Sequence, residues 1–288
     1  MSCLLFDLAI EPLPTMLRNS NLTGFNIPGI VQKLITTLFA DDTTVYLKEN
    51  DDYEVLQDNI TVWCKASGAK FNITKTEIIP IGTPEYREKL IQTRKLNDKC
   101  PPFPEGINIA KDGEPIRILG AWIGNKVEQA EPWTPILEKI DKHLNQWSKS
   151  HPTINGKRLI IQMVVAGMTQ FLTKAQGMPE EIEKRLIKKI RKFMWGSEST
   201  PPISLPILSL PTTEGGMKLL NLKAQNKAIQ LTWLKTYLQM DITRPTWTFI
   251  ADELINKTSL STSTERLTKI NIFMQSWGKT PNTRSKLP

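Results

Sequence analysis

The strongest constraint on the fold is a change in hydrophobic periodicity about 130 residues into the chain. Before that point, apolar residues form short β-branched and aromatic runs broken by Gly, Pro and Asp, as in strands and turns. Beyond it, they recur every three or four residues, as in amphipathic helices. The sequence therefore predicts an α+β fold at the front, with a small antiparallel sheet and helices, followed by an all-helical region.

The helical half is predicted to contain four helices. They span residues 135–150, 156–176, 179–195 and 222–240. A Pro-, Ser- and Thr-rich connector, residues 196–216, separates the last two, and a short helix is predicted near residues 267–277 of a polar tail. We expect three parts: residues 1–125, 130–240 and 241–288.

The front of the chain is predicted to combine two helices with several strands. Residues 2–17 read as a helix that Pro12 and Pro14 kink. A second helix is predicted to start with Asp51 as N-cap and to stop at Gly68. Strands are predicted at residues 31–39, 43–47, 70–81 and 116–123, and residues 83–115 are predicted to be a loop.

Charge is distributed unevenly along the chain. Residues 1–100 hold 11 Lys and Arg against 13 Asp and Glu, a net charge of −2. Residues 101–288 hold 26 against 16, a net charge of +10. An acidic front and a basic back fit a cation site followed by a phosphate-binding surface. Ordinary solvation of a helical region is the alternative.

Cysteine usage and hydropathy narrow the class of protein. Cys3, Cys64 and Cys100 lack paired spacing, which argues against a disulfide framework and a zinc module. The longest apolar stretch, residues 159–172, falls short of the ~20 residues that a membrane span needs. We expect an intracellular protein with no membrane partner, in the nucleus or the cytoplasm.

Two adjacent carboxylates form the most informative candidate site. Asp41 and Asp42 lie between two predicted strands, at the tip of a hairpin. Carboxylates held close repel each other, and Mg²⁺, which prefers oxygen ligands, offsets this repulsion. Two such ions can stabilise the attacking and leaving oxygens of phosphoryl transfer. Acid pairs are also common in solvated turns, which is the alternative for the dipeptide alone.

The predicted helix at residues 179–195 is the main candidate nucleic-acid surface. Its apolar stripe leaves a basic surface formed by Lys184, Arg185, Lys188, Lys189, Arg191 and Lys192. Phosphate contacts from such residues give sequence-independent affinity that weakens with salt. Lys157 and Arg158, after the turn at Asn155-Gly156, are two further candidates. A solvated amphipathic helix that only packs on its neighbours is the alternative.

Several motifs, in order, resemble those of reverse transcriptases from non-LTR (LINE-type) retrotransposons. Phe39-Ala40-Asp41-Asp42 resembles the box that carries catalytic carboxylates. The other matching segments are residues 2–6, residues 67–72 with Lys75-Thr76-Glu77, the primer-grip-like Ile118-Leu119-Gly120, and residues 193–196, 208–211 and 214–216. The resemblance spans roughly residues 2–240.

The resemblance implies a fold, an activity and partners. It implies part of a polymerase palm in residues 1–125 and a helical thumb and connection region in residues 130–240. It implies RNA-directed DNA polymerase chemistry, with Mg²⁺ held by Asp41 and Asp42 and with Lys75 as a proton donor near the triphosphate. The implied partners are nucleic acids, namely an RNA template and an RNA–DNA duplex.

The same resemblance implies that parts of the site are missing. A third metal-binding carboxylate is expected on a strand upstream of residues 2–6, and the fingers are expected further upstream. We therefore expect a fragment that does not polymerise alone and that uses deoxynucleotides only in a longer chain. The alternatives are a non-enzymatic nucleic-acid-binding module and an element remnant without function.

Overall fold

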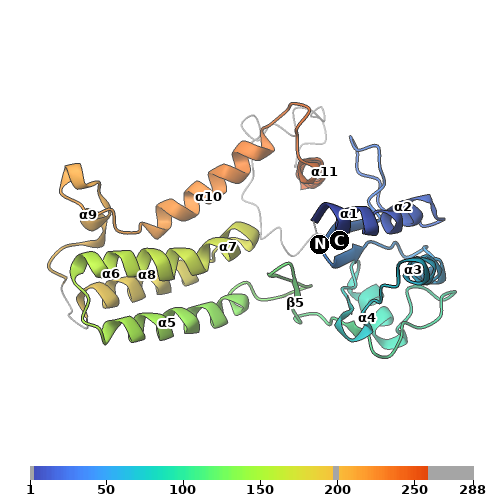
Figure 1. The fold of residues 1–288 in the computed structure, drawn as a ribbon, viewed down its shortest axis with the longest axis horizontal. Helices are drawn as coiled ribbons and strands as arrows, with labels where there is room; N and C mark the ends of the chain where they lie inside the picture. Colours follow the sequence, from blue (N-terminus) through green and yellow to red (C-terminus); the bar gives the residue numbers. More distant parts are fainter. Residues whose placement is uncertain (1–2, 197–200, 259–288) are drawn as a thin grey trace. The chain divides into compact units, whose positions relative to one another are not determined.

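The computed structural model describes residues 3–196 and 201–258 (Figure 1). They form two compact units. Unit 1 contains the described residues of Met1–Ile116, Gly124–Lys126 and Met240–Pro288, and unit 2 contains Arg117–Ile123 and the described residues of Val127–Gln239. The mixture of helices and small sheets agrees with the predicted α+β class. The assignment of palm and thumb, and the division at residues 125, 130 and 240, stay predictions.

Unit 1 begins with two helices in place of one kinked helix. They are α1 (Cys3–Ile10) and α2 (Pro12–Asn19). Pro12 occupies the first position of α2, where a missing N–H leaves no hydrogen bond unmade. Leu13 and Leu17 of α2 are buried in the core of unit 1, together with Ile35 and Leu56.

The predicted hairpin is present but shorter than expected. β1 (Thr36–Phe39) pairs antiparallel with β2 (Asp42–Val45), with Phe39 opposite Asp42 next to the turn. Residues 31–35 do not belong to the strand, although Leu34 forms an isolated bridge with Phe25. The prediction of a strand starting at residue 31 is therefore wrong.

Helix α3 (Tyr53–Ser67) corrects the predicted N-cap. The cap is Asp52, whose carboxylate accepts a hydrogen bond from the Glu54 N–H at 2.9 Å. Asp51 is instead buried, and it accepts hydrogen bonds from the N–H groups of Thr23 and Lys48 at 2.7 and 2.8 Å. Burial raises the pKa of Asp51, but these bonds and one from the Thr23 hydroxyl lower it overall. Asp51 thus fixes the segment after α2 to the start of α3.

The predicted strand over residues 70–81 is wrong. The Asn72 side chain accepts hydrogen bonds from the N–H groups of Thr74 and Lys75 at 3.1 and 3.3 Å, and a 3₁₀ turn, η1 (Ile73–Lys75), forms there. An Asn side chain that bonds to the following backbone favours a turn over a strand. Only β3 (Glu77–Ile78) is extended, and it pairs in parallel with β4 (Asn108–Ile109).

The predicted loop over residues 83–115 contains a helix, α4 (Pro84–Thr93). The Thr83 hydroxyl caps it by accepting a hydrogen bond from the Tyr86 N–H at 3.3 Å, and Pro84 fills its first position. Leu90 of this helix is buried in the core of unit 1. The loop prediction is therefore wrong for these ten residues.

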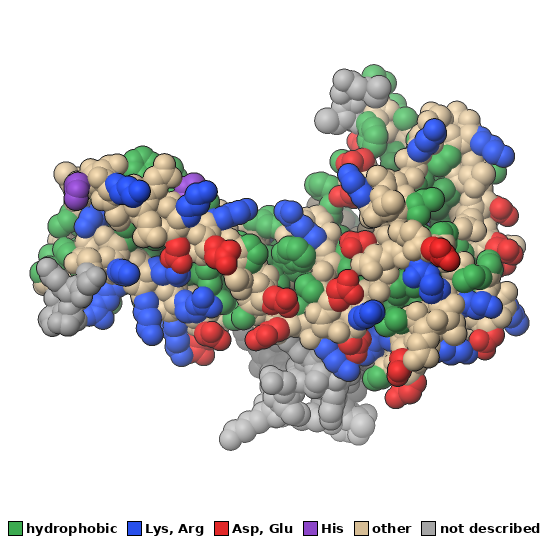
Figure 2. Space-filling model, turned by 90° about the horizontal axis from the view of Figure 1, so that it is seen from below, with side chains coloured by type: hydrophobic (Ala, Val, Ile, Leu, Met, Phe, Trp, Pro, Cys, Tyr) green, Lys and Arg blue, Asp and Glu red, His purple; other side chains and the backbone are tan. Residues whose placement is uncertain are grey.

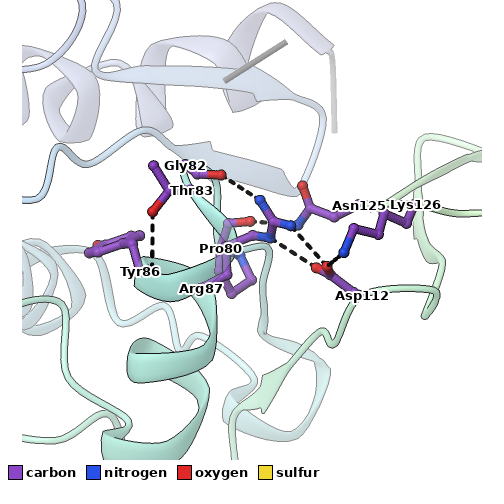
Figure 3. A network of polar contacts seen from close by, with 8 residues as sticks. All are labelled: Pro80, Gly82, Thr83, Tyr86, Arg87, Asp112, Asn125 and Lys126. Atoms are coloured by element: carbon purple, nitrogen blue, oxygen red, sulfur yellow. Dashed lines mark hydrogen bonds and ion pairs between the residues drawn. The ribbon is translucent and has the colours of Figure 1, made fainter. Parts of the chain in front are cut away.

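Lys126 and the nearly buried guanidinium of Arg87 share the Asp112 carboxylate, which holds residue 126 to the rest of unit 1 (Figure 3). Arg87 of α4 donates from Nε and Nη2 to the Asp112 carboxylate at 2.9 and 2.8 Å, and from Nη1 to the Gly82 carbonyl. Lys126 Nζ lies 2.8 Å from the same carboxylate. The hydrogen bonds from Arg87 and Lys126 hold the pKa of Asp112 well below its usual range.

Unit 2 is built around the four predicted helices, all of which are confirmed to within three residues at each end. They are α5 (Thr134–Ser148), the pair α6 (Ile154–Ile161) and α7 (Gly167–Gln176), α8 (Glu180–Trp195) and α10 (Leu222–Tyr237). A π-helical turn, η3 (Gln162–Ala166), joins α6 to α7 without a break. The core between these helices includes Trp133, Ile140, Ile161, Leu186 and Ile190.

A second hairpin belongs mostly to unit 2. β5 (Ile116–Ile118) and β6 (Ala121–Ile123) are joined by the two-residue turn Leu119-Gly120. The predicted single strand over residues 116–123 is therefore two strands. The short elements η2 (Glu131–Trp133), α9 (Leu205–Ser209) and η4 (Thr212–Glu214) complete the unit.

Helix α11 (Thr246–Thr258) was not predicted and lies in unit 1. Arg244 forms an ion pair with Asp252 at 2.8 Å, and its guanidinium lies 4.6 Å from the centre of the Phe249 ring. The helix predicted near residues 267–277 falls outside the described residues. No helix in the described part of the chain has the length and apolar character required to cross a membrane.

Candidate functional site

The β1–β2 hairpin presents the acid pair on a strained turn. Its loop is Ala40-Asp41, and the backbone φ of Ala40 is +50°, while that of Asp41 is negative. A positive φ at the first loop residue alone is the pattern of a type II′ turn, which usually has Gly at that position. An alanine there costs about 1 kcal/mol or more, and such strain is concentrated at functional sites.

Both carboxylates face solvent. Asp41 lies in the turn and Asp42 opens β2, and both residues are exposed. Phe39, directly opposite Asp42, is 64% exposed, whereas Thr36 on the other face of the hairpin is buried. No described residue donates a hydrogen bond to either carboxylate. Their oxygens are thus available to a cation or to a substrate.

Lys75 lies on a different element from the acid pair. It is exposed in η1, where its N–H bonds to Asn72. Within the described residues, no hydrogen bond or ion pair joins its ammonium group to Asp41 or Asp42. The role of Lys75 therefore stays a prediction.

The two carboxylates at the hairpin tip are of the ligand type that Mg²⁺ prefers. Magnesium is usually bound by one or two carboxylates, with water and substrate phosphates as its other ligands. Among the described residues, no group of three or more His, Cys, Asp or Glu side chains is placed to hold a metal ion. Asp41 and Asp42 are the residues that would hold it.

Helix α8 separates its apolar and basic residues as predicted. Ile182, Leu186 and Ile190 are buried, and Phe193 and Met194 continue the apolar stripe into the last turn. Arg185, Lys188, Arg191 and Lys192 are exposed. Figure 2 shows that blue Lys and Arg side chains outnumber red acidic ones on the visible surface of unit 2, at the left.

Several of the predicted phosphate-binding residues have partners inside the protein, and for four of them the partner is a described residue. Lys189 forms an ion pair with Asp141 of α5, and Lys184 forms one with Glu180 at 2.6 Å. The Lys157 ammonium donates to the Met194 carbonyl at 2.8 Å, so it caps the C-terminus of α8. Arg158 Nε donates to Asn155 at 3.1 Å. Of these, Lys157, Arg158 and Lys189 are also partly buried and contribute to packing within unit 2.

One exposed face of α6–α7 was not singled out from the sequence. Residues 151–179 contain no Asp or Glu, and Leu159, Met163 and Phe171 are each more than half exposed, at spacings of four or eight residues. Gly167 lies between them, and a Cβ added there would meet no atom within 4 Å. A helical Gly costs about 1 kcal/mol relative to Ala. No packing contact in the described residues accounts for that cost. The absence of Asp and Glu from residues 151–179 was the sequence feature that could have pointed to this face.

The fold and the acid-bearing hairpin define a class of protein that comparison with known sequences identifies. Residues 1–123 match the family "Reverse transcriptase (RNA-dependent DNA polymerase)". Over 250 residues, or 86% of this chain, the sequence is 23% identical to the "Transposon TX1 uncharacterized 149 kDa protein" of Xenopus laevis. The chain spans 18% of that protein's length. The chain is thus reverse-transcriptase-like over residues 1–123 and similar to a transposon protein over most of its own length.

Proposed function

We propose that this chain supplies the carboxylate hairpin and a duplex-binding helical unit of an RNA-directed DNA polymerase. The observation that carries the proposal is the exposed Asp41-Asp42 pair on a strained two-residue turn, inside the segment that matches the reverse transcriptase family. The reaction class is nucleotidyl transfer from a deoxynucleoside triphosphate to a primer 3′ end. The palm and thumb roles of units 1 and 2 belong to this proposal.

Asp41 and Asp42 would hold Mg²⁺ in this site. When bound, Mg²⁺ neutralises negative charge on the triphosphate and on the attacking oxygen. The two carboxylates would keep the ion at one position, because the short hairpin leaves their backbone little freedom. Exposed Lys75 would give a proton to the departing pyrophosphate.

The basic face of unit 2 would hold the sugar–phosphate backbone. Arg185, Lys188 and Lys192 are the exposed cations of α8 that best serve this role, since Lys157 and Lys189 already bond within the unit. The acid-free face around Gly167 favours the same partner. It offers apolar side chains and the exposed amides of Gln162 and Gln170, without a carboxylate that would repel phosphate. The partners proposed are an RNA template and an RNA–DNA duplex.

We propose further that a polypeptide of these 288 residues does not extend a primer by itself. Two carboxylates leave most of the coordination of two metal ions to water and substrate, so the ions would be poorly positioned. The test is primer extension on a poly-rA/oligo-dT template with Mg²⁺ or Mn²⁺. We expect no extension above background. Extension that disappears in Asp41→Ala would contradict this part of the proposal and would establish the catalytic role directly.

A non-enzymatic nucleic-acid-binding function is the second candidate, and the exposed cations of α8 favour it. It differs from a remnant without function in one measurable property. A binding module loses affinity for an RNA–DNA duplex steeply as salt rises, whereas a remnant shows no such binding. Fluorescence anisotropy with a labelled duplex between 50 and 200 mM salt, the range over which this dependence is large, separates the two.

A further inference from the structure

The β5–β6 hairpin is fastened to helix α7 by one side chain. The Gln176 amide donates from Nε2 to the Trp122 carbonyl at 2.5 Å and accepts from the Trp122 N–H, through Oε1, at 2.9 Å. This pair of bonds is the one that a neighbouring strand would make, so Gln176 takes the place of a strand beside β6. Gln176 is the last residue of α7 and lies 54 positions from Trp122 in the sequence.

Two packing contacts reinforce this attachment. The Trp122 side chain is partly buried and packs against the core of unit 2. At the turn, Gly120 lies so close to the Phe171 ring that an added Cβ would be 3.0 and 3.2 Å from two ring carbons. The hairpin is therefore held at both its strand and its turn by α7, the helix that begins at Gly167.

The turn itself presents an apolar side chain in a strained conformation. Leu119 has a φ of +49° and Gly120 one of +84°, the pattern of a type I′ turn. A positive φ is a genuine outlier for a bulky residue such as Leu, whereas Asn, Asp or Gly would adopt it easily. Leu119 is nevertheless 47% exposed, so burial of its side chain does not explain its presence. Through Phe171, which is 56% exposed, the turn adjoins the acid-free face of α6–α7.

We propose that Gln176 is a positioning residue that locks the Leu119–Gly120 turn against α7, so that the turn and the acid-free face of α6–α7 form one preorganised surface for a nucleic-acid duplex. The proposal rests on the duplex-binding function proposed above. Gln176 touches no part of the duplex in this account. It acts by fixing the hairpin before binding, which lowers the ordering cost of association.

The test uses the 288-residue protein with Gln176→Leu and Gln176→Glu. The first variant removes both hydrogen bonds, and the second keeps an acceptor for the Trp122 N–H but loses the donor. We expect Gln176→Leu to weaken binding of a labelled RNA–DNA duplex by about tenfold, as expected for one or two net hydrogen bonds, and Gln176→Glu to weaken it at least as much, because its carboxylate faces the Trp122 carbonyl and repels phosphate. In Gln176→Leu the slope of log affinity against log salt should not change, because no phosphate contact is lost.

Amide hydrogen exchange at Trp122 provides a second readout that does not depend on nucleic acid. It should accelerate in Gln176→Leu, while circular dichroism and the exchange of α5 and α8 stay as in the wild type. Gln146→Leu is the matched control, because Gln146 is an exposed glutamine on α5 with no side-chain partner in the described residues. This variant should leave both Trp122 exchange and affinity unchanged.

The outcomes separate this proposal from the function on which it rests. If the wild type binds no duplex, the proposed function fails, and the exchange data still decide whether Gln176 holds the hairpin. If the wild type binds and Gln176→Leu binds equally well despite faster Trp122 exchange, the positioning role is wrong. If Gln176→Leu does not fold, Gly120→Ala replaces it, since the added methyl displaces the turn from Phe171. Unchanged affinity in that variant also overturns the proposal.

Discussion

At the scale of single residues, the structure places strain where side chains face solvent. Ala40 and Leu119 both occupy left-handed backbone conformations in two-residue hairpin turns. Neither position is buried, so packing does not require these residues there. Sequence reasoning identified Asp41 and Asp42 because acids between two apolar runs are informative. The strain at Ala40 could not be predicted, because φ in a hairpin turn depends on the number of loop residues. That number follows from the strand register, which the sequence does not show.

The ion pair of Arg87 and Asp112 makes a prediction about stability and pH. Asp112→Asn should lower the free energy of unfolding of unit 1 at neutral pH by about 2 kcal/mol, because it leaves a nearly buried guanidinium without a charged partner. The pKa of Asp112 is lower in the folded state than in the unfolded state. Its contribution is therefore fully present above the ordinary Asp pKa of about 4 and is lost as the pH falls below it.

Chemical denaturation of the wild type and the variant between pH 7 and pH 3 measures this effect. The difference in stability should shrink as the pH falls. Asp98→Asn is the control, because Asp98 pairs with Lys89 on the surface and is 80% exposed. It should leave the free energy of unfolding nearly unchanged, because an exposed ion pair contributes little. A difference for Asp112→Asn that grows on acidification would contradict the assigned direction of the pKa shift.

At the scale of elements, periodicity predicted the helices of unit 2 well and the short elements of unit 1 poorly. The buried apolar face of a helix such as α8 follows from residues three or four positions apart, so local sequence predicts it. The missed helix α4 had a readable signal in Thr83-Pro84, but its charged residues resembled a loop. The turn at Asn72 replaced a predicted strand through a side-chain bond that propensity ignores. The attachment of Trp122 by Gln176 depends on a contact across 54 residues, which no local pattern shows.

The basic face of α8 predicts how binding depends on salt. Lys188→Glu with Lys192→Glu should weaken duplex binding for all sequences alike and flatten the slope of log affinity against log salt by about 2, since each phosphate contact contributes about 0.9. Both residues are exposed and one turn apart, so the fold should survive. Lys139→Glu with Lys142→Glu on α5 makes the same change in net charge at exposed positions and is the control. Equal slopes for the two double variants would remove α8 from the binding surface.

The open position at Gly167 predicts opposite effects on stability and binding. Gly167→Ala should raise the free energy of unfolding of unit 2 by about 1 kcal/mol, because Ala is the better helix former and its methyl meets no neighbour. The same methyl should weaken duplex binding several-fold if nucleic acid approaches the backbone closely there. Thermal denaturation and anisotropy measure the two effects. Asn145→Ala, at an exposed position of α5, should stabilise without loss of affinity. A Gly167→Ala protein that binds as tightly as the wild type would exclude close approach at this point.

At the scale of the whole molecule, the two units divide the proposed function between them. Unit 1 carries the acid pair on a hairpin above a core that includes Leu13, Ile35 and Leu56. Unit 2 carries the exposed cations of α8, the acid-free face of α6–α7 and the β5–β6 turn on a separate core. Where each unit begins could not be predicted, because residues 124–126 join unit 1 through Asp112 and Pro80.

The central claim is that Asp41 and Asp42 hold a divalent ion next to a bound primer end. Iron-directed cleavage tests it most directly and requires no polymerase activity. Fe²⁺ replaces Mg²⁺, and with ascorbate and peroxide it generates hydroxyl radicals that cut nucleic acid only near the ion. With an end-labelled RNA–DNA primer–template, we expect cuts concentrated within a few nucleotides of the primer 3′ end. These cuts should vanish in Asp41→Asn with Asp42→Asn while duplex affinity is retained. Cleavage spread evenly along the duplex, or an unchanged pattern in the double variant, would contradict the account.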